Sequence, residues 1–87
     1  MNVLKVNIYG TDYSIKANAD AEYIREVVHF VDDKMRGIGQ VTSRKSPEDV
    51  AILTALHIAD EFFKQRELIK AVDERIKLLV DRLEEIL

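Results

Sequence analysis

Cysteine is absent from this 87-residue sequence, which also has only three glycines and one proline. Without cysteine, neither disulfides nor thiolate metal sites can add stability. A lone hydrophobic core becomes marginal in a chain of this size. The sequence therefore predicts that oligomerisation supplies the additional stability.

Long apolar runs are also missing. No stretch approaches the roughly eighteen apolar residues of a membrane span, and the N-terminal MNVLKVNIYG alternates polar and apolar residues, unlike a signal peptide. We therefore expect a cytoplasmic protein without a membrane partner. The part from Ser46 onward carries six Lys and Arg against ten Asp and Glu, which disfavours a nucleic-acid partner bound through a basic stripe.

The N-terminal third predicts a β-hairpin packed on a helix. Apolar and polar residues alternate over Val3–Tyr9 and resume over Tyr13–Lys16, with the turn at Gly10–Asp12. Asp20 is a plausible N-cap, and Gly37 and Gly39 are expected to end the helix. One apolar stripe at spacings of three and four residues comprises Ile24, Val27, Val28, Val31, Met35 and Ile38.

A second, much longer helix is expected after the polar loop Gln40–Lys45. Ser46 fits the N-cap and Pro47 the first helical position. No Gly or Pro follows as far as Leu87, so about 41 residues would form a rod of roughly 60 Å. We expect its distal half to protrude from the rest of the chain and to need a partner.

The distal half carries a heptad pattern, here called the seam. Its a and d positions, spaced 3, 4, 3, 4, 3, are Ile69, Val72, Ile76, Leu79, Leu83 and Ile86, and Phe62 extends it backwards at a. Val80 adds an apolar e position, and apolar flanks favour more than two helices. The pattern predicts a homodimer with a tendency to form a homotetramer.

Motifs of enzymes and metal sites are weak by comparison. His29 and His57 each have carboxylates three and four residues further on, but each helix offers a single histidine, so we expect no metal site. There is no Gly-rich phosphate loop or nucleophile elbow, and neither catalysis nor a cofactor is expected. The aromatic residues Tyr23, Phe30, Phe62 and Phe63 are expected in the core, with an aromatic docking pocket as the alternative.

Three sequence blocks in this order resemble the ZapA family of bacterial cell-division proteins. They are Ile8-Tyr9-Gly10, Val31-Asp32-Asp33-Lys34-Met35 and Ala55-Leu56-His57-Ile58-Ala59-Asp60-Glu61. The resemblance implies an α+β, mostly α fold, with a ββα head over residues 1–60 and a coiled-coil stem over residues 61–87. It also implies a dimer, pairs of dimers joined antiparallel through the stems, and no catalytic activity or cofactor.

The resemblance further implies a partner, the tubulin-like FtsZ, whose protofilaments such proteins cross-link in the midcell division ring. The positions that it points to for FtsZ binding are Thr11, Ser14, Lys16, Arg44, Lys45 and Glu48. Relatives often carry basic residues where this chain has Thr11 and Ser14, and Lys16 is expected to take part of their role. The alternative function is that of a small helical homodimeric enzyme with a charged site between its subunits.

Overall fold

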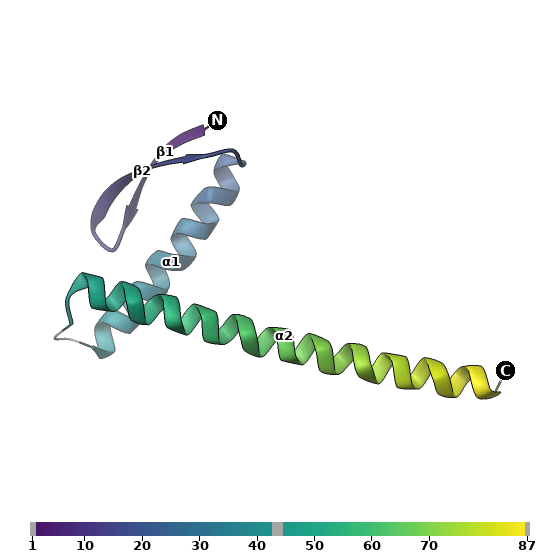
Figure 1. Cartoon of the computed structure of the whole chain (residues 1–87). Helices are drawn as coiled ribbons and strands as arrows, with labels where there is room; N and C mark the ends of the chain where they lie inside the picture. Colours follow the sequence, from purple (N-terminus) through teal and green to yellow (C-terminus); the bar gives the residue numbers. More distant parts are fainter. Residues whose placement is uncertain (1, 43–44, 87) are drawn as a thin grey trace. The chain divides into compact units, whose positions relative to one another are not determined.

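The computed structural model describes residues 2–42 and 45–86 of the chain. Its elements are β1 (Asn2–Ile8), β2 (Thr11–Ala17), α1 (Ala21–Val41) and α2 (Pro47–Ile86) (Figure 1). An antiparallel hairpin followed by one medium and one long helix confirms the predicted α+β, mostly α class. The chain divides into two compact units, residues 1–55 and residues 56–87.

The hairpin turn is shorter than the sequence pattern predicts. Ile8 pairs with Thr11, so Thr11 and Asp12 belong to β2 and not to a loop. The two turn residues, Tyr9 and Gly10, both have positive φ, at 51° and 85°. Positive φ at both central positions is what a type I′ hairpin turn requires, and it is costly for any residue except glycine. Tyr9 therefore occupies a strained backbone conformation.

Helix α1 begins where the sequence predicts but ends later. The Asp20 carboxylate accepts a hydrogen bond from the Glu22 amide at 3.4 Å, which confirms the N-cap. The prediction that Gly37 and Gly39 end the helix is wrong, because α1 continues to Val41. The helix ends at its C-cap Thr42, whose backbone leaves the helical region at φ −119° and ψ 51°, while its amide (3.1 Å) and hydroxyl (2.7 Å) both donate to the Ile38 carbonyl.

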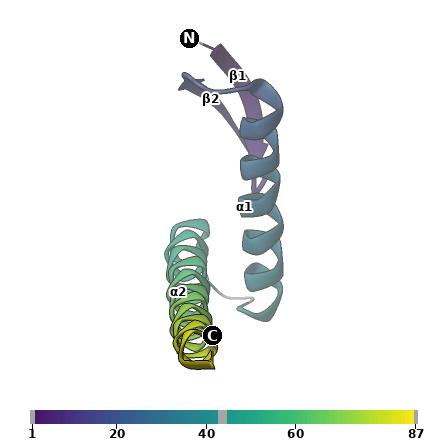
Figure 2. The ribbon, with the colours of Figure 1, turned by 90° about the vertical axis from the view of Figure 1, so that its right-hand side faces the viewer.

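The hairpin lies alongside α1 in both views of the ribbon (Figures 1 and 2). Of the predicted apolar stripe, Ile24 and Met35 are buried, whereas Val27 remains 44% exposed. The stripe is therefore covered only in part by the chain's own hairpin.

Helix α2 begins as predicted. The Ser46 hydroxyl accepts a hydrogen bond from the Asp49 amide at 3.2 Å, and the Ser46 carbonyl accepts one from the Val50 amide at 3.0 Å. Four residues into the helix, Val50 is almost fully buried, and so is Thr54, whose hydroxyl donates to the Val50 carbonyl at 2.7 Å. The first two turns of α2 thus belong to the core of the first unit.

The two glycines inside α1 differ in their surroundings. A Cβ atom at Gly37 would meet nothing within 4 Å, whereas one at Gly39 would collide with the Tyr9 hydroxyl and lie 3.1 Å from the Tyr9 Cζ. The absence of a side chain at position 39 is therefore what allows the tyrosine ring to lie on α1.

We predict opposite outcomes for alanine at these two positions. Gly37→Ala should raise the free energy of unfolding by about 0.5–1 kcal/mol, because alanine favours the helix. Gly39→Ala should lose that gain and destabilise the chain by up to about 1–3 kcal/mol, since the Tyr9 ring must move. Urea denaturation at one fixed protein concentration measures both, and equal stabilisation by the two variants would contradict the packing of Tyr9 on Gly39.

Candidate functional site

A cleft of about 470 Å³ opens in the first unit between the hairpin, α1 and the start of α2. Its lining residues are Ile8, Tyr9, Thr11, Tyr13, Ser14, Ile15, Met35, Pro47, Glu48 and Ala51. Three of the six positions predicted to bind a partner, Thr11, Ser14 and Glu48, therefore lie around one concave surface. Glu48 is more than thirty positions away from Thr11 and Ser14 in the sequence, and the fold brings it to the same cleft.

Lys16 lies on the outward face of the hairpin, where a second lysine joins it. Strand pairing places Lys5 opposite Ser14 and Val3 opposite Lys16. Since alternate residues of a strand share a face, Lys5, Ser14 and Lys16 lie on the same face of the hairpin. All three are exposed. Lys5 was not singled out from the sequence, and the pairing register is what reveals it as a neighbour of Ser14.

Lys45 is exposed just before α2, and Glu48 is exposed in its first turn. Arg44 lies outside the described residues. Glu48 is in the first turn of the helix, where a carboxylate interacts favourably with the positive end of the helix dipole. The helix dipole is therefore sufficient to explain a carboxylate at position 48, whether or not Glu48 binds a partner.

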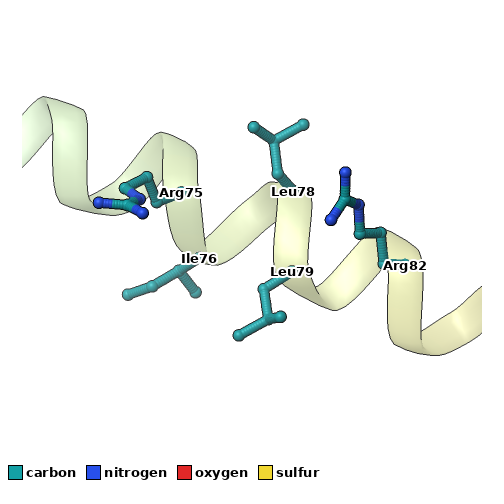
Figure 3. Close-up of a pocket in the computed structure, with 5 residues that line it drawn as sticks. All are labelled: Arg75, Ile76, Leu78, Leu79 and Arg82. Atoms are coloured by element: carbon teal, nitrogen blue, oxygen red, sulfur yellow. The ribbon is translucent and has the colours of Figure 1, made fainter.

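The seam of α2 is uncovered in the second unit. The described side chains of the seam, at Ile69, Val72, Ile76, Leu79 and Leu83, are between 47% and 62% exposed. Ile76 and Leu79 point to the same side of the helix, whereas Leu78 points to the other (Figure 3). This agrees with the assignment of Ile76 and Leu79 to the seam. Val80, at the predicted e position, is also exposed, and the side chain of Ile86 lies outside the described residues.

The aromatic residues predicted to lie in the core do not lie there in the single chain. Tyr23, Phe30, Phe62 and Phe63 are all more than 40% exposed. The Phe62 and Phe63 rings meet edge to face, with centroids 5.7 Å apart, and the Arg66 guanidinium lies over both rings. Since Phe62 itself occupies an a position of the seam, the pair extends the exposed apolar surface of the seam.

Asp32 joins the turn of the hairpin to α1. The Tyr9 amide donates a hydrogen bond to one Asp32 oxygen at 2.8 Å, and Arg36 donates to the other at 3.0 Å. The Tyr9 hydrogen bond, and to a smaller extent the Arg36 guanidinium, hold the pKa of the Asp32 carboxyl below its usual value. We call Tyr9, Asp32 and Gly39 the lock, because the amide and ring of one turn residue both engage α1.

The two histidines contact carboxylates four residues further on in their own helices. His29 lies 3.2 Å from Asp33, and His57 lies 3.1 Å from Glu61. Within residues 2–42 and 45–86, no three His, Asp or Glu side chains gather as they would around a metal ion. Over the same residues, no helix is both long enough and apolar enough to cross a membrane.

The partly covered apolar stripe of α1 and the exposed seam of α2 are surfaces of the kind that self-associating proteins bury. Comparison with known proteins agrees: the family model described as "Cell division protein ZapA" matches residues 4–87. The chain belongs to the ZapA family of cell-division proteins, which are not enzymes. The alternative of a small homodimeric enzyme is therefore set aside.

Similar proteins come from Geobacillus species. The chain is 36% identical to the cell division protein ZapA of Geobacillus kaustophilus over 85% of this chain and 81% of the relative. It is 39% identical to that of Geobacillus thermodenitrificans over 74% of this chain and 70% of the relative. A solved structure, a ZapA mutant dimer from Geobacillus stearothermophilus, superimposes with a TM-score of 0.66 at 36% identity, covering 87% and 88% of the two chains.

We predict that Asp32 gives the fold a specific sensitivity to acid. Because folding lowers the pKa of Asp32, its contribution to stability is fully present above the usual aspartate range of about 4 and is lost as the pH falls below it. Asp32→Asn keeps an acceptor for the Tyr9 amide but removes the charge. The variant should be less stable than the wild type at pH 7, and the gap should close towards pH 3.

Chemical denaturation of both proteins from pH 7 to pH 3 measures this gap. A difference in unfolding free energy that stays constant over the whole range would mean that the Asp32 charge contributes nothing.

Proposed function

We propose that the chain self-associates through the seam and binds FtsZ through its head, cross-linking FtsZ protofilaments at the midcell division site. Family membership supports the role in cell division. The observation that carries the assembly step is the row of half-exposed aliphatic side chains on α2. The solved structure similar to this chain is a dimer of a mutant ZapA.

Self-association follows from the cost of leaving the seam in water. Full burial of one Leu, Ile or Val side chain contributes roughly 1.5–3 kcal/mol. The seam repeats such residues along one side of α2, where α1 and the hairpin belong to a different compact unit. A second copy of the same helix offers a matching apolar surface in the heptad geometry. The proposed assembly is a dimer, with pairs of dimers joined antiparallel through the stems at residues 61–87.

Binding to FtsZ is proposed for the head, residues 1–60. The candidate residues are Thr11, Ser14, Lys16, Arg44, Lys45 and Glu48. Thr11, Ser14 and Glu48 line the cleft, while Lys16 is exposed on the outward face with Lys5. One head need bind only weakly. When two heads are joined, the second binds at a high effective concentration, and two filaments are then held together.

We predict that the seam can be broken without harm to the head. Ile76→Arg should raise the dissociation constant of self-association at least about tenfold, because it removes apolar burial and places a charge in the interface. Ala71→Arg, at the neighbouring c position, adds the same charge outside the seam and should leave assembly unchanged. Sedimentation equilibrium of the full chains measures both.

The same variants test filament bundling. Ile76→Arg should no longer sediment FtsZ bundles at low speed, yet should still bind polymerised FtsZ weakly at high concentration. An Ile76→Arg protein that remained oligomeric and still bundled FtsZ would show that the seam is not the joint.

We predict that the outward lysines of the hairpin contribute to FtsZ binding. Lys16→Glu should weaken co-sedimentation with FtsZ polymerised in GTP by about tenfold, since it replaces a positive charge in the proposed binding face with a negative one. Lys77→Glu makes the same charge change in the second unit, off the seam, and serves as the control. Equal binding by the two variants would remove the hairpin face from the proposed site.

A further inference from the structure

We propose that the lock, Tyr9 with Asp32 and Gly39, consists of positioning residues for partner binding. It would hold the tip of the hairpin in the orientation that presents Thr11 at the cleft that Glu48 also lines. This inference rests on the proposed function, because it concerns how the head prepares its contact with FtsZ. It is carried by the way in which one turn residue is attached to α1.

The hairpin needs such an attachment. A two-stranded sheet is marginally stable by itself in water. Here the turn also places Tyr9, a residue with a bulky side chain, at a positive φ of 51°. The side chain of Asn7 forms two hydrogen bonds within the turn. Its Nδ2 donates to the Asp12 carboxylate at 2.9 Å, and its Oδ1 accepts from the Gly10 backbone amide at 3.2 Å. These exposed bonds shape the turn but do not fix its direction relative to α1.

Tyr9 supplies the direction through two separate points on α1. Its amide binds the Asp32 carboxylate at 2.8 Å, in a place where Asp32 is only 18% exposed. Its ring lies against Gly39, two helical turns further along. Positions 32 and 39 are about 10 Å apart along the helix axis. Two attachment points at this separation fix an orientation, which a single hydrogen bond would not.

The orientation of the turn sets the geometry of the cleft. Tyr9 and Thr11 both line it, and Glu48 faces them from α2. If the turn swung away from α1, Thr11 would move away from Glu48, and a partner would have to order the two sides of the cleft on binding. Ordering a side chain costs about 0.5–1.5 kcal/mol in binding, so a cleft fixed in advance binds more tightly.

The test releases the ring and then restores it. Gly39→Ala should weaken binding of the full chain to GTP-polymerised FtsZ by about fivefold or more. Tyr9→Phe/Gly39→Ala removes the colliding hydroxyl and leaves contacts of 3.1 and 3.3 Å that need only a small shift. It should therefore recover binding to within about twofold of the wild type. Gly37→Ala, where a Cβ meets open space, is the matched control.

Two readouts separate positioning from general stability. Amide hydrogen exchange at Tyr9, measured by NMR, should speed up in Gly39→Ala and slow again in the double variant. The oligomeric state should stay constant across the series. If Gly39→Ala loses its circular dichroism signal, Asp32→Ala replaces it, since that change frees the Tyr9 amide without adding bulk, and the same loss of binding is expected.

Unchanged FtsZ binding in folded Gly39→Ala or Asp32→Ala, with Tyr9 exchanging faster, would overturn the inference. Absence of rescue by the double variant would also overturn it, because the hydroxyl collision would then not be the cause. Failure of the proposed function looks different: the wild-type chain itself would not bind FtsZ at any concentration.

Discussion

The shortage of covered apolar surface is the constraint on which the rest of the structure depends. Among the described residues, the apolar side chains that are buried are Ile24, Met35 and Val50, while the seam stays about half exposed. Folding stability comes largely from apolar burial, and this chain has no disulfide to compensate. In the proposed function, association through the seam would bury apolar surface that the single chain leaves in water.

The lock addresses the same shortage at the other end of the chain. With few side chains packed between the hairpin and α1, the orientation of the turn depends on directional contacts. Three features act on one residue of the turn. Tyr9 has a strained φ, its amide binds the Asp32 carboxylate, and its ring occupies the space left by the missing side chain of Gly39. They also connect two of the sequence blocks that resemble ZapA proteins, Ile8-Tyr9-Gly10 and Val31–Met35. Those blocks are distant in sequence and adjacent in the fold.

Periodicity and capping residues predict the helices and strands. They do not predict the features that depend on tertiary contacts. Ser46 and Asp20 cap the helices as expected, because a cap depends on a few neighbouring residues. The sequence pattern predicts a helix end at Gly39, whereas the structure shows that a side chain at this position would collide with the Tyr9 ring. Tyr9 lies thirty residues earlier, so the local sequence gives no sign of this contact. Lys5 was missed since only the strand register places it opposite Ser14. The role of the seam and the residues that bind FtsZ remain predictions.

The seam and the lock meet different demands of one mechanism, and each makes the other more important. A joined pair of heads gains affinity only if both bind in compatible geometries. Any ordering cost in a head is incurred once per head, so its effects multiply: a roughly fivefold loss in one head becomes roughly twenty-five-fold for a pair that binds with both. In the proposed mechanism, assembly through the seam would amplify weak contacts and, equally, the effect of any disorder in them. A protein that works by multiplying a weak contact has the strongest reason to fix the geometry of that contact in advance, and Tyr9 on α1 provides a way of doing so.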